Sequence, residues 1–162
     1  MSEYDPALTP WIERLRVVRR RKSLYRQSMD VYEILLQLHQ EPGEVAREVL
    51  LWMLDEMPRY SFGEDAEPLR ELERRGDLGA VPALSERVES GRSGGRTLAA
   101  LQALASGARC SCAVHKAMGD QPGPNMQQEG EEVDATLWQR TTWGRCQLCG
   151  VPWKLRRQDQ DR

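Results

Sequence analysis

The residues best suited to chemistry are four cysteines, which lie in two close pairs near the end of the chain. Cys110 and Cys112 are separated by one residue, and Cys146 and Cys149 by two. Thiolates are preferred ligands of zinc, and two of them at such spacing can reach one ion. The first residues, 1–6, are acidic and polar and lack a secretory signal. In the reducing cytoplasm that this predicts, the cysteines are expected to bind a metal and not to form disulfides.

The second pair is followed directly by a glycine, in the order Cys146-Gln-Leu-Cys149-Gly150. That glycine allows the tight turn and the close approach of backbone N–H groups that a zinc knuckle needs. The first pair offers three candidates for two places, because His115 follows Cys112 after a two-residue gap. Two ligand sets are therefore predicted. They are Cys110, Cys112, Cys146 and Cys149, or the same set with His115 in place of Cys110.

Other interpretations of these residues are weaker. Four cysteines without a metal would make two close pairs a coincidence. A redox Cys-x-x-Cys is disfavoured because Cys146 follows a strand-like segment and does not begin a strong helix. A catalytic zinc keeps an open position and works with a general base. The nearby carboxylates, those of Glu129, Glu131 and Glu132, lie in a polar insert, which disfavours that chemistry.

Over about residues 109–156 the arrangement resembles zinc-ribbon and treble-clef modules. The Cys-x2-Cys-Gly half carries the likeness, whereas the Cys-x-Cys-x2-His half departs from the usual Cys-x2-Cys. The resemblance implies a structural Zn²⁺ that is held by four protein ligands, with no open position for water.

Strand-forming residues surround the second pair. Residues 136–143 are rich in Thr and Trp, and apolar residues alternate with polar ones over 151–156, which predicts a β-hairpin. The insert at 117–134 is rich in Gly, Pro, Gln and Glu and is predicted to be a mobile loop at the hairpin tip. Trp138, Trp143 and Trp153 are expected to wall the metal, because so small a module has little other core. Alternatively, one of them is an exposed anchor for a partner.

Apolar residues at helical spacing dominate the chain before residue 107. A first helix is expected from Pro10, where a missing N–H costs nothing. A second is expected from a cap at Ser28 to about Gln40, and a third from Gly43 to Met57. The short connection between the second and third predicts that they pack as an antiparallel hairpin. A short fourth helix ends at the glycine at position 76.

Residues 76–107 predict two more short helices joined by a Gly-rich turn. Their phrases Gly-Asp…Ala-Val-Pro-Ala-Leu and Arg…Ala-Ala-Leu-Gln-Ala-Leu-Ala resemble one HEAT-like helical repeat. The resemblance implies a helical stack with protein-binding potential, and a plain helical hairpin in a small bundle is the alternative. The predicted fold is therefore mainly α. It has an N-terminal helical bundle or short HEAT-like stack at 1–107, a small β-rich zinc-binding module at 108–157 and a disordered tail at 158–162.

Composition limits the classes of function. The chain of 162 residues has a net charge of −2 and no apolar run long enough for a membrane span. Seven basic residues nevertheless cluster near the start, between Arg14 and Arg26. They suit a nucleic-acid surface, but they also suit a solvated helix face, and aromatic residues are not interleaved among them apart from Tyr25.

The sequence contains no phosphate-binding glycine motif and no Ser-His-Asp set that two histidines could support. We therefore expect a small, non-enzymatic, cytoplasmic zinc-binding protein that acts through protein–protein interaction. A bacterial toxin-neutralising (immunity-type) protein is one concrete form of this hypothesis. The alternative is a zinc-ribbon regulator that associates with nucleic acid through the basic Arg14–Arg26 cluster.

Overall fold

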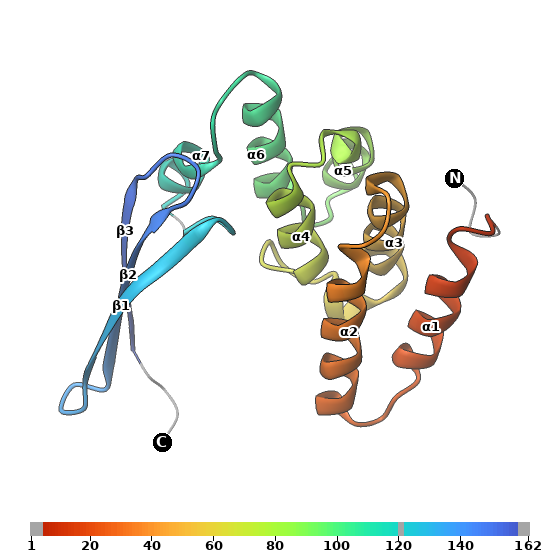
Figure 1. The fold of residues 1–162 in the computed structure, drawn as a ribbon, viewed down its shortest axis with the longest axis horizontal. Helices are drawn as coiled ribbons and strands as arrows, with labels where there is room; N and C mark the ends of the chain where they lie inside the picture. Colours follow the sequence, from red (N-terminus) through yellow and green to blue (C-terminus); the bar gives the residue numbers. More distant parts are fainter. Residues whose placement is uncertain (1–4, 120–121, 159–162) are drawn as a thin grey trace. The chain divides into compact units, whose positions relative to one another are not determined.

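A computed structural model describes residues 5–119 and 122–158 and divides the chain into two compact units, Met1–Thr97 and Leu98–Arg162. In the described part, seven α-helices precede a three-stranded antiparallel sheet (Figure 1), which confirms the predicted mainly α fold with a small β-rich end. The helical elements are α1 (Thr9–Arg19), α2 (Leu24–Leu38), α3 (Gly43–Glu56), the 3-10 helix η1 (Pro58–Tyr60), α4 (Glu67–Arg75), the 3-10 helix η2 (Leu78–Ala80), α5 (Val81–Glu89), α6 (Gly95–Ala105) and α7 (Cys112–Ala117). The strands are β1 (Met126–Asp134), β2 (Gln139–Cys146) and β3 (Pro152–Gln158).

Helix α2 begins one turn earlier than the sequence predicts. The hydroxyl of Ser23 caps it by accepting a hydrogen bond from the backbone N–H of Arg26 at 3.4 Å. The predicted cap, Ser28, lies inside the helix and is wrong. The residues between the two serines include good helix formers, so the helix continues back to the earlier serine.

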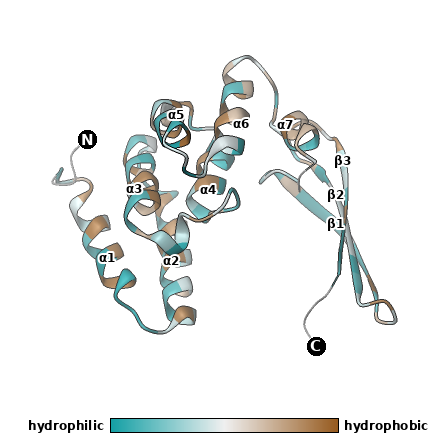
Figure 2. Ribbon diagram, turned by 180° about the vertical axis from the view of Figure 1, so that it is seen from behind, coloured by the Kyte–Doolittle hydropathy of each residue, from teal (hydrophilic) through white to brown (hydrophobic). Residues whose placement is uncertain are grey.

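The first unit is held by apolar side chains from several helices. Figure 2 shows hydrophobic residues as bands along these helices. Helix α3 contacts α4 more extensively than α1, and the packing of α2 on α3 as an antiparallel hairpin stays a prediction. Burying each Leu, Ile or Val contributes about 1.5–3 kcal/mol before entropy is counted. The large side chains of this unit with the least exposure are Leu15, Ile34, Leu38, Val49, Leu50, Met53, Met57, Leu69, Leu72 and Leu84.

A buried arginine joins the loops of this unit. Arg87 on α5 donates hydrogen bonds to the carbonyl oxygens of Ser93 at 2.8 Å, Ser61 at 3.2 Å and Leu54 at 3.3 Å. Buried carbonyls need a donor, and that of Ser61 also accepts the hydroxyl of Ser93 at 2.9 Å. The guanidinium thus provides hydrogen-bond donors to carbonyl oxygens in two loops and near the end of α3.

Helices α5 and α6 are the two short helices predicted over 76–107, and Gly76, in the left-handed conformation, ends α4 as expected. Their assignment to a HEAT-like repeat and the predicted domain boundary at residue 107 stay predictions. Among the described residues, no helix is both long enough and apolar enough to cross a membrane.

The sheet has the order β1-β2-β3. The predicted mobile loop over 117–134 is wrong for 126–134, because these residues form β1 and pair with β2 along its whole length. The tip of this hairpin lies further on. There, the side chain of Asp134 accepts hydrogen bonds from the backbone N–H groups of Thr136 at 2.9 Å and Leu137 at 3.2 Å. Of the predicted tail at 158–162, Gln158 ends β3 and the rest lies outside the described residues.

Candidate metal centre

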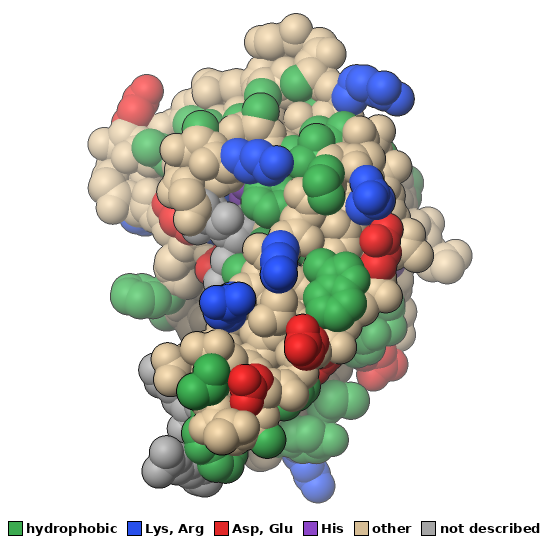
Figure 3. Space-filling view, turned by 90° about the vertical axis from the view of Figure 1, so that its left-hand side faces the viewer, with side chains coloured by type: hydrophobic (Ala, Val, Ile, Leu, Met, Phe, Trp, Pro, Cys, Tyr) green, Lys and Arg blue, Asp and Glu red, His purple; other side chains and the backbone are tan. Residues whose placement is uncertain are grey.

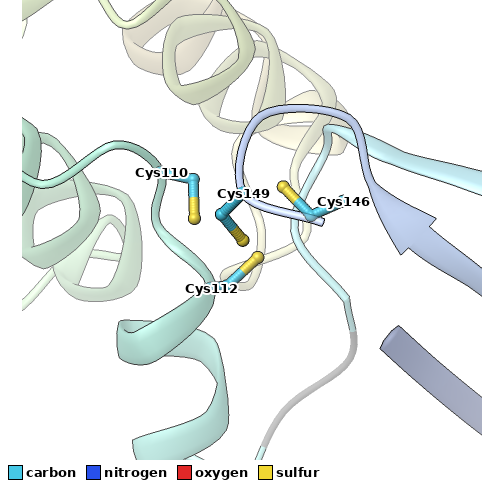
Figure 4. Close-up of side chains that lie close together, drawn as sticks. All are labelled: Cys110, Cys112, Cys146 and Cys149. Atoms are coloured by element: carbon cyan, nitrogen blue, oxygen red, sulfur yellow. The ribbon is translucent and has the colours of Figure 1, made fainter. Parts of the chain in front are cut away.

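The four cysteines, far apart in the sequence, come together in the C-terminal unit. Their sulfur atoms all lie within 4.8 Å of one another. Figure 4 shows Cys110 and Cys112 on the segment that leads into α7, and Cys146 and Cys149 on the turn after β2, with their side chains converging. Cys112 and Cys146 are buried, and the other two are half-buried. All four thiols are free of disulfides.

The second half of the site is a tight turn between β2 and β3. Cys146 donates its backbone N–H to the carbonyl of Val151 at 3.0 Å, and its own carbonyl accepts the N–H of Gly150 at 2.9 Å. The N–H of Leu148 points at the sulfur of Cys146 at 3.4 Å. Gly150 adopts a φ of +74°, which a residue with a side chain adopts only with strain. These contacts form the knuckle that the Cys-x2-Cys-Gly spacing predicts.

The first half of the site is built around the start of α7. Cys112 is the first residue of this helix, and its backbone N–H donates to the sulfur of Cys110. The bend between the two cysteines, and not an extended strand, brings both sulfurs to one side. A one-residue gap therefore suffices where zinc modules usually have two.

Burial and hydrogen bonds divide the thiols electrostatically. Burial raises the pKa of Cys110 and, more strongly, that of Cys112, because a desolvated thiolate is unfavourable. The sulfur of Cys149 accepts the backbone N–H of Val151 and a bond from the Cys110 thiol, which lowers its pKa to about 7. Among Cys110, Cys112 and Cys149, the thiolate form is therefore favoured most at Cys149. A divalent cation would stabilise the thiolate form of the others.

The donor set and spacing fit one tetrahedral ion. Sulfurs bound to zinc at about 2.3 Å in a tetrahedron lie roughly 3.8 Å from one another. The four sulfurs here, all within 4.8 Å of one another, are near that arrangement before any ion is considered. Four thiolates in a tetrahedron suit zinc or an iron–sulfur centre.

His115, the alternative ligand, is buried on α7 but does not belong to the group of side chains within reach of one ion. Its ring lies against the backbone of Gly123, where an added Cβ would be 3.1 Å from Nε2. The structure thus gathers the first of the two predicted sets, with Cys110 in it. That these thiols ligate a metal is a proposal, taken up below.

The three tryptophans have different surroundings. Trp153 on β3 is half-buried, and its indole N–H lies beside the Cys112 thiol, where it offsets only part of the rise in the pKa of that thiol that burial causes. Lys116 of α7 places its Nζ 5.2 Å from the centre of the Trp153 ring. Trp143 and Trp138 are 37% and 45% exposed. Of the three tryptophans, Trp153 lies against the site. Its position beside Cys112 could not be predicted from the sequence, because it depends on which residues of β2 and β3 pair.

The carboxylates that the sequence disfavours as a catalytic base lie on β1. Glu129 and Glu131 are 3.5 Å and 3.2 Å from Arg145 and Arg140 of β2, as surface ion pairs. Among the described residues, the group within reach of one ion contains no carboxylate. The other histidine, His39, lies 3.0 Å from an amino group of Arg74 in the first unit.

Comparisons with protein-family models, with curated proteins and with solved structures found no match for this chain. The resemblance to zinc-ribbon modules therefore rests on the spacing of the cysteines in the sequence, and the structure shows that the four thiols gather.

Proposed function

We propose that this is a non-enzymatic zinc-binding protein in which a structural Zn²⁺ holds the C-terminal unit and the helical surface acts through protein–protein interaction. One observation carries the metal part of the proposal. Four thiols from two distant segments lie within reach of one ion, and among the described residues no His, Asp or Glu side chain joins them.

A structural role follows from the ligands. Four protein ligands fill a tetrahedral ion and leave no position for water or substrate. A catalytic zinc would need one of the four replaced by water and a base beside it. Glu129 and Glu131 of β1 are instead held in surface ion pairs, so they support a solvated strand and not a general base.

A protein-binding role for the first unit is supported by what its surface displays. Several large apolar side chains of this unit are at least 45% exposed, including Val17, Leu24, Phe62 and Leu78. A specific form of the proposal is a bacterial toxin-neutralising protein. Such a protein needs only to cover its partner, and the small size and net charge of −2 are in keeping with that role.

The nucleic-acid alternative receives less support. Three arginines of the basic Arg14–Arg26 cluster are engaged within the first unit: Arg14 by Gln37, Arg19 by Glu56 and Arg21 by Asp30. Figure 3 looks onto the side of the sheet and α7, and not onto α1, and on that face too Lys and Arg side chains are interspersed with acidic and hydrophobic ones. Mixed charge of this kind weakens the attraction for a phosphate backbone.

Elemental analysis tests the metal site. Protein purified under reducing conditions, with zinc and iron both present during expression, is expected to carry about one zinc per chain. The variants Cys110→Ser and Cys146→Ser should lose it, whereas His115→Ala should retain it. A wild-type protein with no bound metal, or with iron and sulfide, would contradict the zinc site. Loss of zinc in His115→Ala with retention in Cys110→Ser would identify the other ligand set.

The interaction part has a separate test. The zinc-loaded chain is used as bait, and bound proteins are identified and remeasured with purified components. We expect a partner of micromolar or tighter affinity, and its absence would refute the role. A gel shift with DNA or RNA at low salt, weakening steeply as salt rises, would favour the alternative instead.

A further inference from the structure

Helix α2 carries a second apolar face, opposite the one it buries. Tyr25, Met29, Tyr32 and Leu36 are 75%, 50%, 60% and 48% exposed. At 100° per residue they fall within about 60° of one another around the helix. The buried residues of α2 lie about 160° away, and they are Gln27, Val31, Ile34 and Leu38. The exposed face is therefore not an edge of the core.

The spacing of this stripe is four, three and four residues, which is the pattern of the core positions in a coiled coil. That pattern places apolar side chains on one line for about three helical turns. Single exposed apolar residues are common on protein surfaces, but a continuous line of large ones marks an interaction site.

We propose that this α2 stripe, made of Tyr25, Met29, Tyr32 and Leu36, is a homodimer interface in which α2 pairs antiparallel with α2 of a second copy. The proposal does not depend on the zinc site, because all four residues lie in the first unit.

Self-pairing is favoured by the order of the side chains. In an antiparallel pair with its two-fold axis between Met29 and Tyr32, Tyr25 faces Leu36 of the second copy and Met29 faces Tyr32 of the second copy. Each layer then joins one aromatic ring with one aliphatic side chain, and Met sulfur packs well against rings. A two-fold axis repeats both layers and closes the assembly at two chains.

Charges beside the stripe agree with the same orientation. Arg26 and Glu33 lie seven residues apart, on the same flank of the stripe. Reversing the second helix brings Arg26 of one copy near Glu33 of the other, twice by symmetry. In a parallel pair, Glu33 would instead face the neutral Ser28. The flanks thus carry both signs, as a protein interface would, whereas a membrane-surface helix would be rich in Lys and Arg.

The area available sets the expected strength. The two tyrosines alone leave roughly 200–340 Å² exposed in each copy. With Met29 and Leu36, a dimer would bury on the order of 1,000 Å² in total, which is the lower limit for a specific interface. The dissociation constant of the dimer is therefore expected to be on the order of 10 µM.

Sedimentation equilibrium of the full, zinc-loaded chain from about 1 to 200 µM tests the proposal. The mass should rise from the 18.6 kDa of one chain towards twice that value. Met29→Glu should weaken the dimer at least about tenfold, because two added carboxylates meet Glu33 in the interface. Phe62→Glu, at a residue that is 91% exposed outside α2, is the matched control and should dimerise normally.

A charge exchange tests the orientation. Arg26→Glu and Glu33→Arg should each weaken the dimer several-fold, and the double variant should restore it. Circular dichroism of each variant checks that the helices are intact. The proposal is overturned if the wild-type chain stays monomeric over the whole concentration range. It is overturned in the same way if the chain binds anionic vesicles but stays monomeric. It is also overturned if Met29→Glu dimerises like the wild type, and failure of the double variant to recover overturns the antiparallel arrangement.

Discussion

The six helices that begin before residue 97 and the three strands near the end of the chain differ in what they bury. Helices α1 to α4 contribute side chains such as Leu15, Leu50, Met53 and Leu72 that have essentially no contact with solvent. In the sheet, β1 and β3 contain no buried residue, and the two buried residues of β2 are Gly144 and Cys146. One is a glycine and the other is a proposed ligand.

This difference shows where each region obtains its stability. A helical unit that excludes water from many large side chains can fold on the hydrophobic effect. A three-stranded sheet with almost no buried apolar surface needs another source, and small domains commonly use a metal. The four-thiol group is therefore expected to contribute most of the cohesion of the sheet, and none of that of α1 to α4.

The largest effect that would sharpen this contrast is removal of the metal. Chelation, or the Cys146→Ser change, should unfold the sheet and leave the helices in place, since structural zinc supplies about 10–16 kcal/mol of apparent binding energy in finger peptides. Hydrogen exchange read by mass spectrometry should show loss of protection in β1 to β3 with α1 to α4 unchanged. Sheet amides that stay protected after complete zinc removal would show that the sheet is stable on its own.

A core truncation should do the opposite. Met53 on α3 is fully buried, and Met53→Ala should lower the free energy of unfolding of the helical unit by about 2–5 kcal/mol. Zinc content and affinity should not change. Urea unfolding followed at 222 nm measures the first effect, and a chelator titration the second. Met29→Ala, at a methionine that is 50% exposed, is the matched control, measured at about 1 µM so that the α2 stripe does not associate. A loss of zinc in Met53→Ala would contradict the independence of the two regions.

The same contrast explains what the sequence could predict. The helices of the first unit announce themselves locally, because apolar residues recur at helical spacing and Pro or Gly residues stand near several ends. Ser28 misled the placement of α2 because a serine can sit inside a helix when an earlier serine caps it. The spacing of Tyr25, Met29, Tyr32 and Leu36 also indicates a second apolar line on α2. The sequence prediction instead relied on the face that contains Val31 and Ile34, which is the buried one.

Strand β1 was missed for a physical reason. Its residues, Met-Gln-Gln-Glu-Gly-Glu-Glu-Val-Asp, show no apolar alternation because neither face of the strand is buried. It is held by backbone hydrogen bonds to β2, which depend on distant pairing and leave no trace in composition. The gathering of the cysteines was predictable from their spacing. The choice between Cys110 and His115 was not, because it depends on the bend that starts α7 at Cys112.

Mild acidification should weaken zinc binding by the C-terminal unit while the stability of the helical unit does not change. Burial raises the pKa of Cys110 and Cys112, so the metal-free fold keeps both protons, and zinc must displace them. Zinc affinity should therefore fall at least about a hundredfold for each pH unit lowered, and more steeply below about 7, where Cys149 also becomes protonated. Competition with a chromophoric chelator between about pH 8 and 6.5 measures this slope.

The helical unit gives the control for that titration. Although burial opposes it, Arg74 and Arg75 hold the pKa of Glu71 below its ordinary value. A carboxyl group whose pKa is lowered in the fold stabilises the fold at any pH above the ordinary carboxyl pKa. That stabilisation is lost only as the pH falls below the ordinary value and through the lowered one. The stability that Glu71 contributes should thus be constant while zinc affinity falls. A zinc affinity that is independent of pH would mean that the thiols are already ionised before the metal binds.

The smallest expected effect comes from the same substitution, glycine to alanine, made once in each region. Gly150→Ala places a side chain at a φ of +74° and should cost about 1–2 kcal/mol. Because the turn forms together with the metal site, the cost should appear as an affinity for zinc that is lower by about five- to thirtyfold. Gly43→Ala, at the start of α3, meets no atom within 4 Å and has no positive φ. It should raise the stability of the helical unit by about 0.4–1 kcal/mol and leave zinc affinity unchanged.

The two alanine variants separate local strain from a general intolerance of change. Gly150→Asn should recover part of the zinc affinity, since Asn tolerates the left-handed conformation better than Ala. If Gly150→Ala bound zinc as tightly as the wild type, the Cys146–Gly150 turn would have to relax at little cost, and the knuckle would not be the rigid half of the site. Equal losses in Ala and Asn would contradict strain at φ as the cause, because such strain would spare Asn, and a Cβ at position 150 meets no atom within 4 Å.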